Sequence, residues 1–209
     1  MAKTLQVKNK NPRTSVQSVS SVSHSRCPWP GADALMQQYH DEEWGTPQHN
    51  DQKLFEAVVL DAFQAGLSWK TVLHKRENFR KAFDNFDANK IAKYDEKKIA
   101  SLLGDAGIIR NKLKVRAAVT NAQKFLIVQK EIGSFDKYIW QFTGYKTIVN
   151  KNKSIKDFIA HSKESDAMSK DLLKRDFKFV GTTICYAFMQ AVGMVNDHTV
   201  DCFRYKKLI

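Results

Sequence analysis

Apolar residues recur every three or four positions along most of the chain beyond residue 50, the spacing that is typical of amphipathic helices. Strand patterns are scarce, and residues 145–149, the only candidate, look more like part of a loop. Asp51 is a plausible N-terminal cap for the first helix. We therefore expect an all-α fold, with helices over residues 54–69, 69–83, 87–103, 111–132, 135–142, 165–175 and 182–192.

The bulk composition indicates a globular chain. Its 209 residues suit one compact domain or two small lobes, and a hydrophobic content of 43% is enough for a sizeable core. No apolar run is long enough to span a bilayer, so we expect no membrane partner. The 3 cysteines are too few for a disulfide framework. Cys185 lies in an apolar stretch and is most simply a buried core thiol.

Residues 1–26 differ from the rest because they carry basic side chains, no acidic one, and many Ser, Asn and Gln residues. This composition predicts a disordered basic tail before a folded domain at 27–209. The tail has no continuous apolar stretch, which argues against a secretory signal, and arginine is sparse for an organelle transit peptide. The expected location is cytoplasmic or nuclear, with organelle targeting a minor alternative.

The net charge of +12 does not come from the tail alone, so the folded domain is basic in its own right. Such an excess favours a polyanionic partner, and nucleic acid is the commonest one. A protein that is merely basic would show the same charge. Charge therefore leaves both interpretations open.

Metal-ligating residue types occur at both ends of the predicted domain: Cys27 and His40 near its start, His198 and Cys202 near its end. His198 and Cys202 are spaced by one helical turn, so they can face the same way. Zinc binds four thiolate and imidazole ligands tetrahedrally, and one shared ion would tie the chain ends together. Alternatively, the two pairs never meet. The spacing matches that of a zinc finger poorly, so it does not decide between one shared ion and two separate pairs.

Asp61 falls inside the apolar run of residues 54–69. A lone buried carboxylate is costly, so its pKa rises or a cationic or hydrogen-bonding ligand compensates it. The plainer alternative is a hydrogen bond to the backbone or to Gln64. Gly66 then ends the helix and leaves Leu67 at a turn, where it either wedges into a base stack or packs back on its own core.

A second glycine, Gly181, lies between the two last predicted helices. Glycine lets backbone amides approach a phosphate oxygen, and the helix beginning at Thr182 adds its positive dipole end, with Lys178 nearby. The alternative is an ordinary helix connection. The aromatic residues Trp29, Tyr39, Trp44 and Trp69 suit a flat cationic base, although any single ring is more simply core or surface filler.

Taken in order, segments at residues 26–29, 39–45, 64–69, 105–110, 178–190 and 195–198 strongly resemble the DNA-3-methyladenine glycosylase I family. The resemblance spans residues 26–205, nearly all of the chain except the tail. It implies the all-helical helix-hairpin-helix glycosylase architecture, with a lesion pocket between two lobes. It also implies one structural Zn²⁺ bound by Cys27, His40, His198 and Cys202.

The family excises 3-methyladenine from alkylated double-stranded DNA as a monofunctional hydrolase in base excision repair. The resemblance therefore implies DNA and the free base as partners, and a monomer. It implies that Trp69 and Tyr39 stack on the flipped base, while Trp44 and Trp29 line the pocket. Leu67, beside Gly66, would fill the gap in the duplex, and the hairpin would grip phosphate through Lys178, Gly181 and Thr182.

One departure concerns the catalytic and base-recognising carboxylate. The family usually has Glu where this chain has Asp61, which is shorter by one methylene, about 1.5 Å. This motivates an alternative function, a non-catalytic or altered-specificity binder of alkylated DNA on the same scaffold. A weaker alternative is a zinc-stapled DNA-binding module without a pocket. Thr182 and Thr183 follow the hairpin where bifunctional relatives carry a Lys nucleophile, which argues against a lyase.

Overall fold

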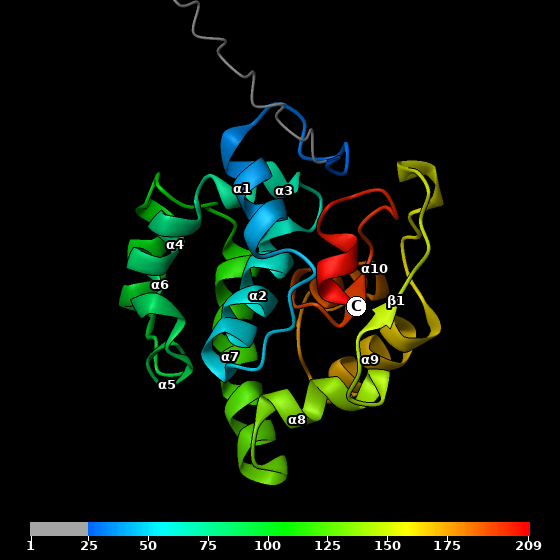
Figure 1. Cartoon of the computed structure of the whole chain (residues 1–209). Helices are drawn as coiled ribbons and strands as arrows, with labels where there is room; N and C mark the ends of the chain where they lie inside the picture. The colour runs from blue at the N-terminus through cyan, green and yellow to red at the C-terminus, as the bar shows by residue number, and fades with distance from the viewer. Residues whose placement is uncertain (1–24) are drawn as a thin grey trace, which may run out of the picture.

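The computed structural model describes residues 25–209, and the predicted tail up to residue 24 lies outside them. The described chain is mostly helical, as expected (Figure 1). Short 3-10 turns occupy Asp84–Phe86, Gln141–Thr143, Ile155–Asp157 and Tyr205–Leu208. The α-helices are α1 (Ala34–Glu42), α2 (Asp51–Gln64), α3 (Trp69–Leu73), α4 (Arg76–Ala82), α5 (Ala88–Ile91), α6 (Glu96–Gly104), α7 (Lys112–Ile132), α8 (Phe135–Trp140), α9 (Lys163–Lys174) and α10 (Thr182–Ala191).

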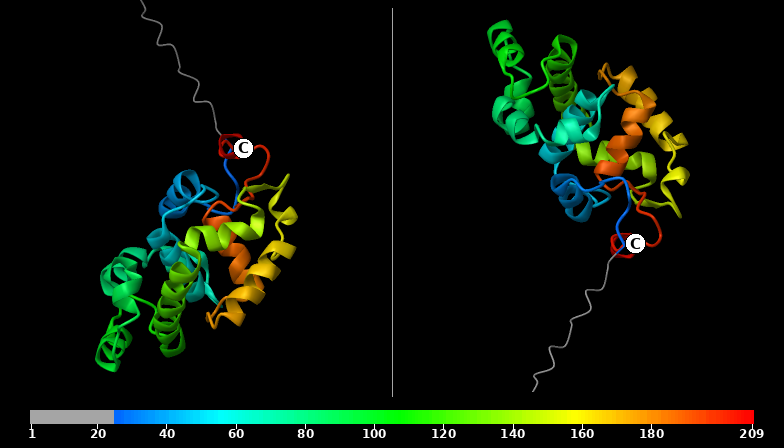
Figure 2. Two further views of the ribbon diagram at one scale, coloured as in Figure 1. Left: turned by 90° about the horizontal axis from the view of Figure 1, so that it is seen from below. Right: turned by 90° about the horizontal axis from the view of Figure 1, so that it is seen from above.

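Helix α2 lies at the centre and packs against α3, α7, α8 and α10. Helices α4, α5 and α6 lie on one side of it beside α7, and α9 with α10 lies on the other (Figures 1 and 2). This central position explains why α2 is apolar nearly all round: its buried side chains face both groups of helices. Asp61, on this helix, is thereby carried into the middle of the molecule.

A second, smaller apolar cluster joins the two ends of the described chain. It contains Cys27, Met36, Tyr39 and Trp44 from the N-terminal side and Cys202 with Tyr205 from the C-terminal side. Ser25, at the border of the predicted tail, accepts a hydrogen bond from the backbone N–H of Phe203. The fold therefore closes on itself at this cluster.

Two long helices predicted from the sequence are each interrupted. The segment 69–83 forms α3 and α4, and the segment 87–103 forms α5 and α6. The side chain of Asp95 accepts from the N–H of Lys98 and so begins α6 anew. Buried apolar residues lie on both sides of each break, so the apolar spacing continues across it. Periodicity alone therefore missed them.

Three smaller expectations were wrong. Asn50 caps α2, while Asp51 accepts hydrogen bonds from the N–H groups of Phe135 and Asp136 at the start of α8. Helix α2 ends at Gln64, short of residue 69. The segment expected to be a loop contains strand β1 (Ile148–Val149), which pairs in parallel with β2 (Val195–Asn196). No helix among residues 25–209 is long and apolar enough to cross a membrane.

Candidate active site and metal centre

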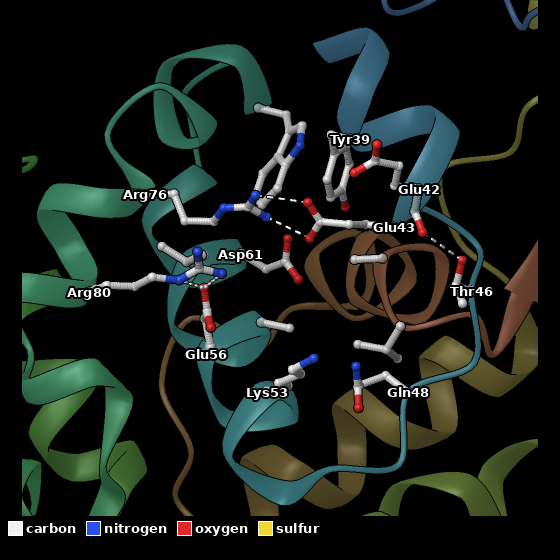
Figure 3. A pocket seen from close by; sticks show the side chains of 15 residues that line it. Tyr39, Glu42, Glu43, Thr46, Gln48, Lys53, Glu56, Asp61, Arg76 and Arg80 are labelled. Atoms are coloured by element: carbon white, nitrogen blue, oxygen red, sulfur yellow. Dashed lines mark hydrogen bonds and ion pairs between the residues drawn. The ribbon is translucent and has the colours of Figure 1, made fainter. Parts of the chain in front are cut away.

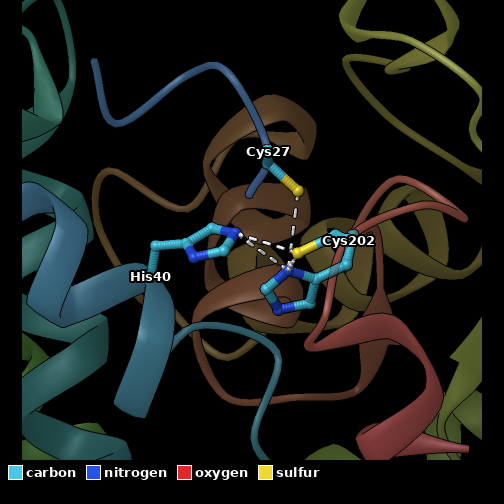
Figure 4. Close-up of side chains that lie close together, drawn as sticks. Cys27, His40 and Cys202 are labelled. Carbon is cyan, nitrogen blue, oxygen red and sulfur yellow. Dashed lines mark hydrogen bonds between the residues drawn. The ribbon is translucent and has the colours of Figure 1, made fainter. Parts of the chain in front are cut away.

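Cys27, His40, His198 and Cys202 converge, and all four side chains are buried. Figure 4 shows Cys27, His40 and Cys202 pointing toward one another. Their ligand atoms lie within 4.8 Å of one another. His198 Nδ1 is 3.6 Å from Cys27 Sγ, 3.5 Å from Cys202 Sγ and 3.1 Å from His40 Nε2. The structure therefore excludes the alternative in which the two pairs never meet.

These separations fit a zinc ion. With Zn–S near 2.3 Å and Zn–N near 2.0 Å, a tetrahedron places sulfur and nitrogen about 3.5 Å apart and two nitrogens about 3.3 Å apart. The cluster thus has the donor types of a closed Cys2His2 site, and the three separations around His198 Nδ1 are close to those of a tetrahedron. The sequence predicted that these four residues could hold a metal ion, and the structure brings them together as such a group.

The hydrogen bonds behind the two histidines strengthen this fit. His198 Nε2 lies 3.0 Å from the carbonyl oxygen of Trp44, which can only accept, so Nε2 carries the proton. His40 Nδ1 lies 2.7 Å from the Asp41 carboxylate, which also accepts, so on this ring Nδ1 carries the proton. The lone pairs of His198 Nδ1 and His40 Nε2 then face each other, an arrangement that a shared cation relieves.

The predicted helical turn between His198 and Cys202 is not present. The chain follows β2 into a turn in which the N–H of Cys202 donates to the carbonyl of Thr199 at 2.8 Å. The N–H of Thr199 points at Cys27 Sγ, 3.3 Å away, and supports negative charge on that sulfur. The two ligands therefore converge through a turn rather than a helix.

Trp29 and Trp44 contact the histidine rings of this cluster, and Tyr39 and Trp69 extend the aromatic packing from Trp29. Trp29 and Trp44 meet edge to face with ring centroids 5.0 Å apart, and Trp29 lies 5.5 Å from the ring of His40. Tyr39, on α1, has its ring centroid 5.2 Å from that of Trp69 at the start of α3. A rigid metal cluster would therefore also hold the aromatic rings in place.

These rings border a cavity of about 180 Å³. Phe158 also lines it and stacks on Trp44 at 6.3 Å. Phe158 was not predicted from the sequence, because it lies in a loop without periodicity and no motif includes it. The lining residues are Trp29, Tyr39, Trp44, Asp61, Gln64, Trp69, Phe158, Ala187, Gln190 and Ala191.

Three residues of this lining have buried polar atoms without a hydrogen-bond partner in the described part of the chain: Asp61 Oδ2, Trp29 Nε1 and Trp69 Nε1. Burial raises the pKa of Asp61 well above its usual range, and its side chain is only 2% exposed. Unpaired buried polar atoms are costly, so their grouping at one cavity points to a ligand that offers hydrogen bonds.

A second cavity of about 310 Å³ shares Tyr39, Asp61, Trp69 and Ala191 with the first (Figure 3). Its wall is charged. Arg76 binds Glu43 through two contacts of 2.7 and 2.8 Å, and Arg80 binds Glu56 at 2.8 Å. Asp61 thus lies on the wall common to an aromatic cavity and a charged one.

The chain matches the methyladenine glycosylase family model over residues 29–205. It is 46% identical to DNA-3-methyladenine glycosylase 1 of Escherichia coli strain K12 over 86% of this chain and 96% of that protein. The DNA-3-methyladenine glycosylase of Haemophilus influenzae is also 46% identical, over 85% of this chain and 96% of its own length. The chain belongs to the methyladenine glycosylase family.

Solved structures of family members agree with this assignment. A crystal structure of 3-methyladenine DNA glycosylase I superposes with a TM-score of 0.84 at 45% identity, covering 86% of this chain and 98% of that one. The Staphylococcus aureus enzyme, solved to explain its recognition of 3-methyladenine, has a TM-score of 0.84 at 31% identity and covers 86% and 96%. The fold described above is therefore that of the methyladenine glycosylases.

The family resemblance implied that a base stacks on both Tyr39 and Trp69. The rings are in contact at 5.2 Å and inclined by 45°, whereas a base between them needs about 7 Å, twice the usual ring spacing. In this conformation a base can lie against an outer face of either ring. A sandwich requires the two rings to separate by about 2 Å.

The turn after α2 leaves an apolar side chain in solvent. Gly66 has φ +77°, a conformation that favours glycine, and Leu67 is 42% exposed. Leu67 therefore does not pack back fully on its own core. This geometry is compatible with the predicted wedge.

The connection between α9 and α10 is held firmly by neighbouring side chains. Asn121 donates to the carbonyl of Lys178 at 3.0 Å and accepts from its N–H at 2.7 Å. Gly181 is the N-cap of α10 and provides no side-chain cap, so the helix amides stay open to a ligand. The hydroxyl of Thr182, however, bonds Asp166 and Ser165.

Asp197 has a structural role. Its buried carboxylate accepts from the hydroxyl of Tyr186 at 2.8 Å and from the amide groups of Gln190, Asn150 and Asn152 at 2.6 to 3.0 Å. Buried among these donors, it ties α10 to the segment after β1. Cys185, predicted to be a core thiol, is buried on α10, and burial raises its pKa to about 12.

Proposed function

We propose that this chain is a monofunctional DNA glycosylase that hydrolyses the N-glycosidic bond of 3-methyladenine in alkylated double-stranded DNA. The observation that carries the proposal is a group of buried atoms, Asp61 Oδ2 with two indole N–H groups, that have no hydrogen-bond partner within residues 25–209 and lie among aromatic rings. A flipped purine offers both hydrogen-bond donors and acceptors at its edge and a flat face for the rings. The relatives named as 3-methyladenine glycosylases support the same substrate.

The cationic character of the lesion explains this choice of residues. Methylation at N3 gives the base a positive charge, which aromatic faces such as those of Tyr39 and Trp69 attract. Asp61, which is buried and forms no ion pair within residues 25–209, gains a compensating partner when the base enters. Binding of the cation therefore favours the ionised carboxylate, which is the form that accepts a hydrogen bond from the base.

The same charge weakens the bond to be broken. The glycosidic bond electrons pass to the base, which leaves as neutral 3-methyladenine, while positive charge develops on the sugar. Water attacks the sugar carbon and loses a proton to solvent or to the ionised Asp61. A carboxylate held in a low-dielectric site stabilises such developing charge strongly. Thr182 and Thr183, rather than a lysine, directly follow Gly181, so the proposed reaction has no Schiff-base step.

We propose that the helix-hairpin-helix device of this chain is α9 and α10 with their connection. Phosphate oxygen would bind at the open amides beside Gly181, with Lys178 adding positive charge. Thr182 would contribute its backbone N–H, since Asp166 and Ser165 occupy its hydroxyl. Leu67 would fill the space left by the flipped nucleotide.

We further propose that Cys27, His40, His198 and Cys202 bind one structural Zn²⁺, and that the domain from residue 27 onward acts as a monomer. The ion supplies a cross-link between the chain ends rather than a reactant. The tetrahedral spacing and the facing lone pairs support zinc in particular. The ring packing of Trp29 against His40 would pass this rigidity to the base pocket.

The second candidate, a binder with no turnover or with altered specificity, follows from Asp61. Aspartate reaches about 1.5 Å less far than the glutamate usual in the family. The charged cavity beside Asp61 provides space that a bridging water or a larger adduct would fill. This candidate predicts binding of alkylated duplex without release of the base.

Incubation of the purified chain with methylated duplex DNA separates the two candidates. The proposal predicts release of free 3-methyladenine well above the spontaneous rate measured without protein. Binding of the duplex in a gel-shift assay, together with release at the spontaneous rate, would instead establish the second candidate.

A further inference from the structure

Lys114 is a buried cation without an acidic partner among the described residues. Its side chain donates from Nζ to the carbonyl oxygen of Phe63 at 2.8 Å and to that of Ala65 at 2.5 Å. These are among the last carbonyls of α2, directly before Gly66 and Leu67. The residue is 6% exposed, and burial lowers its pKa.

The place of Lys114 brings electrostatic costs as well as a gain. Lys114 belongs to the first turn of α7, where the helix dipole disfavours a positive charge. A buried ammonium also loses its hydration, and two neutral carbonyls replace it only in part. What the ammonium gains is the negative end of α2, whose terminal carbonyls lack partners within the helix.

Helix α7 also contacts the second candidate DNA-binding element. Lys114 Nζ lies 5.9 Å from the ring centroid of Phe179 in the connection between α9 and α10. Asn121, two turns further along α7, binds both backbone groups of Lys178 in that connection. One face of α7 therefore holds both the Leu67 turn and the hairpin.

We propose that Lys114 is a positioning residue that fixes the Leu67 turn relative to the α9–α10 hairpin, so that Leu67 enters the duplex while the hairpin holds the backbone. This inference rests on the proposed glycosylase function. Its physical basis is geometric: two loops that grip one strand at two points must keep a fixed separation. Small displacements of positioning groups commonly cost large factors in rate.

A double-mutant cycle between Lys114→Met and Leu67→Ala tests the inference. Methionine keeps an unbranched side chain of similar length and removes the charge and its hydrogen bonds. The measured quantity is the single-turnover rate of 3-methyladenine release from methylated duplex, with melting temperature as a check of folding. Lys130→Met is the matched control, because Lys130 is exposed and lies about 24 Å further along the same helix.

We expect Lys114→Met to melt close to the parent temperature and to slow release by about tenfold to a hundredfold. In the Leu67→Ala background, Lys114→Met should change the release rate by no more than about twofold, because the side chain that Lys114 positions is already absent. Lys130→Met should release base at the parent rate.

Two results would overturn the inference alone: parental release by Lys114→Met, or an equal slowing by Lys114→Met with and without Leu67. If the parent chain itself releases base only at the spontaneous rate, the proposed function fails and this inference fails with it. The parent measurement therefore distinguishes the two failures.

Discussion

His40 and His198 face each other through ring nitrogens 3.1 Å apart, and the hydrogen bonds behind both rings direct the protons away from that contact. Two bare nitrogens at this distance repel each other unless a cation lies between them. The contact spans 158 positions of sequence, so a bound ion would act as a cross-link between the chain ends.

Loss of this cluster is predicted to destabilise the fold. Cys202→Ser should lower the bound zinc from one ion per chain to none, and the free energy of unfolding should fall by several kcal/mol. Metal analysis by mass spectrometry and chemical denaturation measure the two effects. Cys185→Ser is the control, since this buried cysteine lies outside the cluster and should keep its zinc. Zinc retained by Cys202→Ser would contradict the proposed ligand set.

The raised pKa of Asp61 predicts how stability depends on pH. Burial raises its pKa in the folded chain above the unfolded value, so folding favours the protonated carboxyl. The contribution of the protonated Asp61 carboxyl to stability is fully present below its unfolded pKa and is lost as the pH rises through its folded pKa. Asp61→Asn stays neutral, so its melting temperature relative to the parent should rise as the pH is raised above the unfolded pKa of aspartate, about 3.9, and should level off once the raised pKa of the folded chain is passed. A pH-independent difference would show that the carboxyl is not desolvated in the free protein.

Gly193 is predicted to be intolerant of any side chain. It has φ +72°, and a Cβ there would lie 2.3 Å from backbone atoms of Thr46 and Pro47. Gly193→Ala should therefore cost about 3 kcal/mol or more, because both backbones must move. Gly144→Ala is the matched control, with φ +62° and open space around its Cβ, and should cost about 1 kcal/mol. Thermal denaturation of both variants checks this prediction. Equal losses of stability would mean that the positive φ, and not the contact with Thr46 and Pro47, determines the cost.

Trp69 is predicted to report on base binding. Its indole N–H is buried without a partner in the described chain, and its ring borders both cavities. Free 3-methyladenine should quench tryptophan fluorescence in the parent, and Trp69→Phe should weaken binding by about tenfold through loss of one hydrogen bond and some stacking area. Trp140→Phe is the control, since Trp140 Nε1 donates to Gln48 and its ring borders neither cavity. Unchanged affinity in Trp69→Phe would place the base elsewhere.

Much of this architecture follows from local patterns. The long helix α7 was predicted nearly to the residue because Asn111 caps it and its apolar spacing is unbroken. The breaks after Leu73 and Ile91 were missed, since buried apolar residues continue with helical spacing on both sides of each break. Helix α1 was also missed: it is short and has few apolar positions, and its cap Asp33 precedes no strong periodic run.

The site was predictable only in part, because contacts between distant segments leave no local pattern in the sequence. Residue type and family motifs pointed to Cys27, His40, His198 and Cys202, but sequence spacing could not reveal that these ends meet in space. Phe158 and the ion pair of Arg76 with Glu43 depend on tertiary packing and have no local pattern. The contact between Tyr39 and Trp69 likewise follows from how α1 meets α3, which no periodicity shows.

The most direct test of the central claim is the single-turnover rate of 3-methyladenine release from methylated duplex DNA by the parent, Asp61→Asn and Asp61→Glu. The account predicts rapid release by the parent, a loss of about a hundredfold or more in Asp61→Asn, and substantial activity in Asp61→Glu, which keeps the carboxylate. Equal release by the parent and Asp61→Asn would contradict it, because the unpaired buried carboxyl would then have no part in the reaction.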